Sequence, residues 1–305
     1  MIPPIKKEID VIIATHKRPE SLKRTLSSIL ECRVNDQFDY CLTVVDNNSL
    51  DQTKNVVTGL MPLFKGKLKY LFESKQGKNN ALNTAIQQTS GEYIVLTDDD
   101  CLMDKEWLVN IVSVLKEKDV DILGGPIKPF FERPIPSWID LNNKIFHGPL
   151  VHYQLSDRYF DSTEQMIFPP GANMVIRRSA YIKFNGFEQG TRAQDTEICY
   201  NWHRLGAKIG YAPNVLVHHI TPDSRLNKNY FRHWQFLSGK NSSTISTDEY
   251  KKEGRIFWGV PLWMYKSLFK SIGRYLTEIF NVKKNFVNEL WIHLHWGEIQ
   301  GIRSR

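Results

Sequence analysis

Short apolar runs alternate with helical patterns along the first half of the chain. Four compact runs rich in β-branched residues predict buried strands at 10–14, 42–45, 68–72 and 93–97. Apolar residues at helical spacing predict helices behind Pro19, over 78–88 and along 107–115. Because strands that alternate with helices are typical of βαβ units, the pattern predicts an α/β domain with a mostly parallel sheet flanked by helices.

The pattern loosens after Gly124-Gly125. Prolines stand at 126, 129, 134 and 136, and periodicity stays weak to about 167, which predicts a long irregular excursion. Order then returns in four predicted elements, namely a strand at 172–176, a helix at 195–205 and short strands at 208–211 and 215–218. The α/β pattern therefore continues beyond the excursion.

Polar segments follow three of the predicted strands. THKR (15–18) ends the first strand, DNNS (46–49) the second and TDDD (97–100) the fourth. Asp, Asn and Ser also cap helices routinely, so each segment alone has a purely structural explanation. Ligands of parallel sheets bind beyond the carboxyl ends of the strands. Three such segments at one edge therefore indicate a binding site.

The triplet Asp98-Asp99-Asp100 is the most distinctive of these segments. Adjacent carboxylates repel one another unless a positive group lies among them, and Mg²⁺ typically takes one or two carboxylates together with substrate phosphates. On an extended segment Asp98 and Asp100 face the same way, and Asp99 faces the opposite way. The triplet predicts a divalent cation site, with a solvated acidic turn as the alternative.

The segment GKNNALN (77–83) opens the predicted helix over 78–88. Small residues allow a ligand to approach the backbone, and a lysine beside a helix N-terminus favours anions. An ordinary helix start explains the segment equally well, so it supports a nucleotide site only together with the strand ends.

Charge and aromatic residues are concentrated at the C-terminus. The 305 residues have a net charge of +7, yet residues 225–305 contain 14 Lys and Arg against 6 Asp and Glu, a balance of +8. Five of the eight tryptophans also lie there. No apolar run approaches the roughly 20 residues that a membrane span needs. The four cysteines form no CxxC pair, which favours a cytoplasmic protein without zinc or disulfides.

Seven segments in order resemble family 2 glycosyltransferases. They are VIIATHKRPESLKRTLSSI, VVDNNSLDQT, QGKNNALNTAI, GEYIVLTDDD, GANMVIRRSAYIKFNGFE, QDTEICYNWHRLGAKIGYAP and VLVHH. The resemblance runs from about Ile9 to His219. It implies the GT-A fold, a Rossmann-like nucleotide-diphosphosugar-binding domain, over residues 1–224. Residues 225–305 then form a basic, Trp-rich helical extension.

The resemblance also implies roles for individual residues. The residues that match the donor nucleotide site are Thr15, Arg18, Asp46, Gly77, Lys78, Asn83, Asp98 and Asp99. Gly171, Ala172 and Asn173 match the segment beneath donor sugar and acceptor. Asp98 and Asp100 match the DxD-type motif that binds Mn²⁺ or Mg²⁺, and His218 matches a histidine that reaches the metal in some relatives. Asp195 matches the general base of an inverting transfer.

The sequence departs from the family's pattern at two places, and each departure leaves an alternative open. Gln194 precedes Asp195 where many relatives have Glu, so Glu197 is an alternative base. Histidine is doubled at 218 and 219, and the sequence does not decide which one faces the metal or whether it is a buried structural residue.

The resemblance implies an inverting, metal-dependent transfer from a nucleotide-diphosphosugar, UDP-linked in most relatives, to a glycan or lipid-linked hydroxyl. Such a reaction suits the synthesis of bacterial surface polysaccharides. The alternatives are a nucleotidyltransferase that uses the carboxylate triplet for two metals and a nucleotide-sugar-binding partner that has lost turnover. The first would need further phosphate-binding Lys or Arg, and the second is disfavoured by Asp98, Asp100 and Asp195.

The basic extension suggests a further partner. Apolar residues at helical spacing over 261–280, with Lys266, Lys270 and Arg274 among them, and a second patch at 290–295 predict amphipathic helices. Basic amphipathic helices with Trp and Tyr are typical of membrane surfaces, which predicts a cytoplasmic protein bound peripherally to the inner face of the cell membrane. A helical subdomain packed on the core or at a dimer contact is the alternative. Nucleic-acid binding is disfavoured because no recognised motif accompanies the charge.

Overall fold

A mixed sheet forms the centre of the first of two compact units. The computed structural model describes residues 7–187, 194–245 and 255–304. Its contacts divide the chain into one unit of residues 1–128 and 153–220 and a second of residues 129–152 and 221–305. The predicted boundary between 224 and 225 stays a prediction, since this division falls after Ile220 and assigns part of the excursion to the C-terminal unit.

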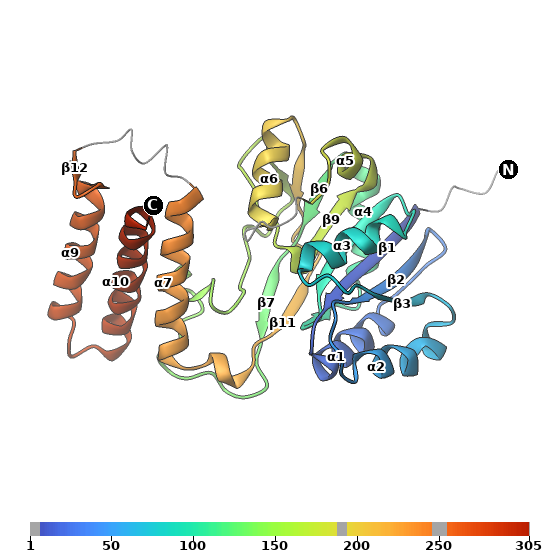
Figure 1. The fold of residues 1–305 in the computed structure, drawn as a ribbon, viewed down its shortest axis with the longest axis horizontal. Helices are drawn as coiled ribbons and strands as arrows, with labels where there is room; N and C mark the ends of the chain where they lie inside the picture. The colour runs from blue at the N-terminus through green and yellow to red at the C-terminus, as the bar shows by residue number, and fades with distance from the viewer. Residues whose placement is uncertain (1–6, 188–193, 246–254, 305) are drawn as a thin grey trace. The chain divides into compact units, whose positions relative to one another are not determined.

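The large sheet has eight strands in the order β3-β2-β1-β4-β9-β6-β10-β8 (Figure 1). The strands are β1 (Lys7–Thr15), β2 (Phe38–Asp46), β3 (Leu68–Phe72), β4 (Tyr93–Asp98), β6 (Ile122–Gly124), β8 (Phe160–Asp161), β9 (Met174–Arg177) and β10 (Ile209–Tyr211). The first four are mutually parallel, and β9 runs antiparallel to β4 and β6 on either side of it. A smaller sheet has the order β5-β11-β7 and consists of β5 (Cys101–Met103), β11 (Val217–Ile220) and β7 (Ile127–Phe130).

Helices connect and cover the parallel strands. They are α1 (Pro19–Leu30), α2 (Thr53–Leu60), α3 (Lys78–Gln87), α4 (Trp107–Glu117), α5 (Arg178–Lys183) and α6 (Gln194–Arg204). α1 shows why these segments are helical: Pro19 lies at its first turn, and Leu22, Leu26 and Ile29 form one buried stripe. The strands, with buried residues on both faces as in β4, are typical of a sheet between helix layers.

Most predicted elements are confirmed. The strand expected at 68–72 is β3, and the expected helices behind Pro19 and over 78–88 and 107–115 are α1, α3 and α4. The strand expected at 172–176 begins later, because Gly171–Asn173 form a 3-10 turn ahead of β9. Within the expected irregular excursion the chain forms β7, the 3-10 turn Lys144–Phe146 and β8.

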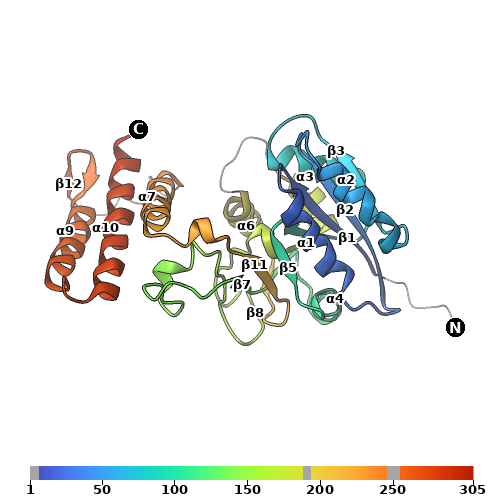
Figure 2. The same ribbon diagram turned by 90° about the horizontal axis from the view of Figure 1, so that it is seen from below.

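Three long helices dominate the second unit, α7 (Lys228–Ile245), α9 (Leu262–Thr277) and α10 (Val282–Arg303). α10 lies between α7 and α9 in both views (Figures 1 and 2). A Cβ added to Gly297 would lie 2.1 Å from the Phe236 carbonyl oxygen, so the glycine allows α10 to pack closely on α7. The amphipathic helix expected at 261–280 is confirmed as α9, and the patch at 290–295 lies within α10, while α7 was not predicted.

A short β-ribbon, β12 (Ile256–Phe257) and β13 (Val260–Pro261), precedes α9. Segment 139–150 packs its apolar side chains with those of α7 and α10, and Trp138 makes edge contacts with the rings of Phe231 and Phe286 at 5.2 and 5.0 Å. The second unit therefore has its own hydrophobic core.

A buried ion pair joins three segments at the amino-terminal end of the parallel strands. Arg178 Nη2 lies 2.7 Å from Asp10 Oδ2, and the same guanidinium donates hydrogen bonds to the Gly91 and Ile86 carbonyl oxygens. Asp10 Oδ2 also accepts a hydrogen bond from the Gly91 N–H at 2.6 Å. The network therefore ties β1 to α5, to the end of α3 and to the α3–β4 loop.

We expect Arg178→Met to lower the free energy of unfolding by about 3–5 kcal/mol, because it leaves the buried Asp10 carboxylate without its cation. Arg177→Met is the matched control. Its ion-pair partner Asp119 is 96% exposed, so loss of that ion pair costs about 1 kcal/mol or less, and loss of the Arg177 Nε bond to the Val120 carbonyl oxygen adds about 1 kcal/mol. Urea unfolding followed by circular dichroism measures both variants, and equal midpoints would contradict the prediction.

Candidate active site

Three strand ends meet at one edge of the large sheet. Thr15 pairs in register with Asp46 across β1 and β2, and Ala14 pairs with Asp98 across β1 and β4. The hydroxyl of Thr15 and the carboxylates of Asp46 and Asp98 therefore follow neighbouring parallel strands at the same level. The structure brings these residues together as the sequence pattern predicted.

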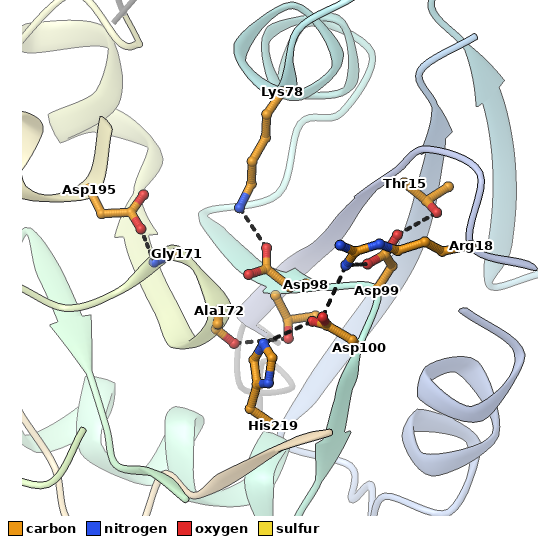
Figure 3. Close-up of polar contacts among 11 residues, drawn as sticks. Thr15, Arg18, Lys78, Asp98, Asp99, Asp100, Gly171, Ala172, Asp195 and His219 are labelled. Carbon is orange, nitrogen blue, oxygen red and sulfur yellow. Dashed lines mark hydrogen bonds and ion pairs between the residues drawn. The ribbon is translucent and has the colours of Figure 1, made fainter. Parts of the chain in front are cut away.

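The three carboxylates of the triplet have different partners (Figure 3). Asp98 Oδ1 lies 2.6 Å from Lys78 Nζ at the start of α3. Asp99 Oδ2 accepts a hydrogen bond from Thr15 Oγ1 at 2.6 Å. Arg18 Nη1 lies 3.3 Å from Asp99 Oδ1 and 3.0 Å from Asp100 Oδ2, so it bridges these two carboxylates.

Arg18 and Lys78 offset the mutual repulsion of the triplet. Burial raises the pKa of Asp99, while the Thr15 hydroxyl and the Arg18 guanidinium act in the opposite direction. Burial alone would lower the pKa of Lys78, but the charges of Asp98 and Asp195 outweigh it and the pKa is raised. The lysine is therefore protonated at neutral pH, and its positive charge lies against Asp98.

Asp195 stands apart from the triplet and is held by a backbone amide. The N–H of Gly171 donates to Asp195 Oδ2 at 2.7 Å, and a Cβ added to Gly171 would lie 2.9 Å from Asp195 Oδ1. Burial raises the pKa of Asp195, and Lys78 opposes that rise. A half-buried carboxylate with a raised pKa, held by a backbone amide, has the properties of a general base.

Glu197, the alternative base, lies in a different environment. It lines a cavity of about 440 Å³ together with Phe187, Asn201 and Trp202. No interaction of Glu197 with Gly171 or Lys78 is present among the described residues. The structure therefore favours Asp195.

The turn that carries Gly171 is fixed by buried hydrogen bonds. The Ala172 carbonyl oxygen accepts from Thr97 Oγ1 at 2.9 Å. The side chain of Asn173 is fully buried; its Nδ2 donates to the Pro126 and Val215 carbonyl oxygens, and its Oδ1 accepts from Trp107 Nε1. Asn173 therefore uses its amide to hold the turn, and only the backbone at Gly171 and Ala172 lies beside the acidic residues.

The histidine beside the triplet is His219. Its Nε2 lies 3.1 Å from Asp100 Oδ1, and its side chain is buried. His218, which the sequence assigned to the metal, faces the other side of β11, where burial lowers its pKa and Asp104 and Lys128 are the nearby charges. Because side chains alternate along a strand, only one of the pair can face Asp100. The structure therefore places His219, and not His218, beside Asp100, and a role of this histidine at a metal stays a proposal.

Two residues expected in the nucleotide site, Asp46 and Gly77, are held by hydrogen bonds to neighbouring segments. Asp46 is buried, and its two oxygens accept hydrogen bonds from the Ser49 N–H and the Tyr70 hydroxyl, both at 2.9 Å. The Gly77 N–H donates to Asn47 Oδ1 at 2.7 Å, with Gly77 at φ 129°, a conformation that favours glycine.

Asn83, another residue expected in the nucleotide site, bonds to residues outside the strand ends. Its side chain bonds to Tyr181 Oη and the Phe187 carbonyl oxygen, so it links α3 to the α5 region. Tyr70, which orients Asp46, was missed from the sequence, because nothing in the LKYLF strand marks it as functional.

The donor set is compatible with a hard divalent cation. No group of three His, Cys, Asp or Glu side chains among residues 7–187, 194–245 and 255–304 is arranged to hold a metal ion by itself. Mg²⁺ and related ions bind through one or two carboxylates plus substrate phosphates, and Asp98 and Asp100 supply such oxygens. The His219 Nδ1 is buried with no hydrogen-bond partner in the described part of the chain. The residues thus fit a metal that arrives with a diphosphate.

These features place a candidate active site at the strand ends of an α/β sheet, and comparisons with known proteins identify the family. The profile of Glycosyl transferase family 2 matches residues 10–184, and the chain belongs to this family. It is a glycosyltransferase with the GT-A fold and a C-terminal helical extension. This assignment favours the transferase hypothesis over the nucleotidyltransferase alternative.

Individual relatives agree with this assignment. The chain is 23% identical over 296 residues to the succinoglycan biosynthesis protein ExoM of Rhizobium meliloti, covering 96% of this chain and 92% of that protein. It is also 23% identical to the poly(ribitol-phosphate) beta-N-acetylglucosaminyltransferase TarP of Staphylococcus aureus, covering 92% and 83%. Mannosyltransferase PcManGT from Pyrobaculum calidifontis, solved with GDP-Man and Mn²⁺, has the same fold with a TM-score of 0.65 at 16% identity, covering 99% and 89%.

Proposed function

We propose that this protein is an inverting, metal-dependent glycosyltransferase. It transfers a sugar from a nucleotide-diphosphosugar, with a UDP-sugar as the first candidate, to a hydroxyl of a glycan or lipid-linked acceptor in bacterial surface polysaccharide synthesis. One arrangement carries the proposal: Asp98 of the triplet pairs with Lys78 at 2.6 Å, and Asp195 is held separately by the Gly171 N–H at 2.7 Å. The triplet with Lys78 offers a site for the leaving diphosphate, and Asp195 offers a site for the acceptor proton.

The chain's own residues account for donor binding. Asp46 would accept a hydrogen bond from the base, and the Thr15–Arg18 turn would lie along the ribose and diphosphate. Arg18 and Lys78 are cations at the strand ends, where a diphosphate would form charge-assisted hydrogen bonds. A Mn²⁺ or Mg²⁺ ion held by Asp98 and Asp100 would supply further positive charge that offsets the charge developing on the leaving diphosphate.

Asp195 accounts for the transfer step. Its carboxylate accepts the proton of the acceptor hydroxyl as the acceptor oxygen bonds to the anomeric carbon and the bond to the diphosphate oxygen breaks. One displacement from the face opposite the leaving group inverts the anomeric configuration. The three carboxylates of the triplet are engaged by Thr15, Arg18 and Lys78, so we assign none of them to a double displacement.

The acceptor class is supported by the relatives. The name of ExoM refers to succinoglycan biosynthesis, and that of TarP refers to a poly(ribitol-phosphate) acceptor. Both are consistent with an acceptor that belongs to the cell surface. A lipid-linked acceptor would require the enzyme to work at the inner face of the cell membrane, where the basic C-terminal residues suit anionic lipid.

A thermal-shift panel tests the proposal. We expect one of UDP, GDP and dTDP, with Mn²⁺, to raise Tm clearly more than the others, because ligand at 100 times Kd stabilises the fold by about 2.7 kcal/mol. For a domain of this size that corresponds to a rise of roughly 5–10 °C.

The same panel with EDTA in place of Mn²⁺ is the control, and the selected diphosphate should then stabilise the protein much less. A panel in which no diphosphate shifts Tm, with or without metal, would contradict a nucleotide-diphosphosugar donor.

A further inference from the structure

The helix α9 and the turn after it expose apolar side chains. One face of α9 packs on α10 through Met264 and Leu268, which join Ile299 and Ile302 in a buried cluster. α9 lies on the opposite side of α10 from α7 (Figures 1 and 2). Its remaining surface is therefore outside the three-helix core.

Five large apolar residues form what we call the apolar edge, namely Phe269, Leu276, Ile279, Phe280 and Val282. Phe269 and Leu276 are seven residues apart and lie on the same side of α9. Ile279 and Phe280 follow in the turn after α9, and Val282 is the first residue of α10. Phe269 is 66% exposed and Phe280 is 98% exposed. Single exposed apolar residues are common on protein surfaces, but a group of neighbouring ones indicates an interaction surface.

Positive charges border the apolar edge. Lys266, Lys270 and Arg274 are four residues apart and form one exposed row along α9. Lys283 and Lys284 continue it beyond the turn, and all five are exposed. In the described part of the chain, Lys284 is 3.9 Å from Glu278, and the other four have no ion pair. We call these five residues the basic row.

Only one class of partner suits both the apolar edge and the basic row. A second copy of this chain in a two-fold contact would place one basic row against another, with repulsion between like charges. A nucleic acid would neutralise the basic row but leave Phe280 and its neighbours in water. An anionic bilayer accepts apolar side chains at its interface and neutralises lysine and arginine at the level of its phosphates.

We propose that the apolar edge inserts into the interface of an anionic phospholipid bilayer while the basic row binds the lipid phosphates. This rests on the proposed function, because a lipid-linked acceptor needs an enzyme held at the membrane. The lysine stems lie along the apolar surface while their ammonium groups reach the headgroups. In the described ranges no helix is long and apolar enough to cross a bilayer, so this contact is with the surface.

Co-sedimentation of the full chain with phosphatidylglycerol–phosphatidylethanolamine vesicles tests the proposal, with phosphatidylcholine vesicles as the neutral comparison. The triple variant Lys266→Gln, Lys270→Gln and Lys283→Gln should lower the partition constant about 100-fold, at about fivefold per charge. Leu276→Ser with Phe280→Ser should lower it about tenfold or more. Binding of the wild type should weaken at high salt.

Matched controls separate the proposed surface from net charge and total apolarity. Lys23→Gln, Lys69→Gln and Lys105→Gln remove the same charge from exposed sites of the first unit, and Leu63→Ser with Ile182→Ser remove exposed apolar residues there. These variants should bind vesicles within about twofold of the wild type. Equal losses in the control and the α9 variants would overturn the proposal.

Other outcomes identify other partners. A change of oligomeric state by size exclusion in the Leu276→Ser, Phe280→Ser variant, without vesicle binding by the wild type, would overturn the proposal in favour of self-association. Binding of RNA but not of vesicles would overturn it in favour of a nucleic acid.

All variants should keep the nucleotide thermal shift. Vesicle failure with an intact shift contradicts only this inference, and vesicle binding without any shift contradicts only the proposed function.

Discussion

Asp195→Asn should lower kcat by about 10² to 10⁴ while the Kd for the donor changes no more than a few-fold, because a general base acts only as the acceptor proton leaves. Asparagine keeps an oxygen that can accept the Gly171 N–H bond, so the turn and the fold should survive. The expected loss is therefore one of chemistry and not of structure.

The pH profile gives a second readout of the same residue. Burial raises the pKa of Asp195, and the group must be deprotonated to accept a proton. Wild-type kcat should therefore fall as pH decreases through that raised pKa, above the ordinary aspartate range, and this acid limb should be absent from the residual rate of Asp195→Asn. Initial rates of nucleoside diphosphate release across pH measure both effects.

Glu197→Gln is the matched control for this experiment. It removes a carboxylate two residues along the same helix, from the wall of the neighbouring cavity. Near-normal kcat is expected. If Glu197→Gln is inactive and Asp195→Asn is active, Glu197 is the base. If both variants keep normal activity, the single-displacement mechanism is contradicted.

Asp100→Ala should abolish transfer and remove the metal-dependent part of nucleotide binding. In the folded chain Asp100 is shared by Arg18 and His219, and after its loss Arg18 retains Asp99 as a partner. The fold should therefore persist, while one of two carboxylates available to a divalent cation is gone. Calorimetric titration of the selected diphosphate with and without Mn²⁺ should show a difference in affinity for the wild type and little difference for Asp100→Ala.

Asp119→Ala is the control, since it removes an exposed carboxylate that pairs with Arg177 outside the site. Its nucleotide affinity should match that of the wild type under both conditions. Metal-dependent affinity that is unchanged in Asp100→Ala would show that the triplet does not hold the cation, even if activity were lost for another reason.

The sequence by itself determined the elements whose signals are local. Compact runs of β-branched residues placed β1 to β4, and period-3.6 patterns placed α1, α3 and α4, because burial in these elements follows from the local sequence. The polar segments at the strand ends indicated the site for the same reason: parallel strands place their carboxyl ends at one edge, whatever the rest of the fold.

Only the tertiary structure decided features that depend on pairing between distant segments. His219 rather than His218 faces Asp100 because β11 pairs with β5 in one register, and a shift by one residue would exchange the two side chains. β9 pairs antiparallel with β4 and β6, from which the long excursion separates it in sequence, so no local pattern fixes its direction.

Long-range packing also fixed the functions of single polar residues. Asn173 holds the turn because its side chain bonds to Trp107, Pro126 and Val215, and Lys78 pairs with Asp98. A sequence lists such donors and acceptors without their partners. The partner of each is decided in the folded chain, because burial removes water and most buried polar groups then need a hydrogen bond within the protein.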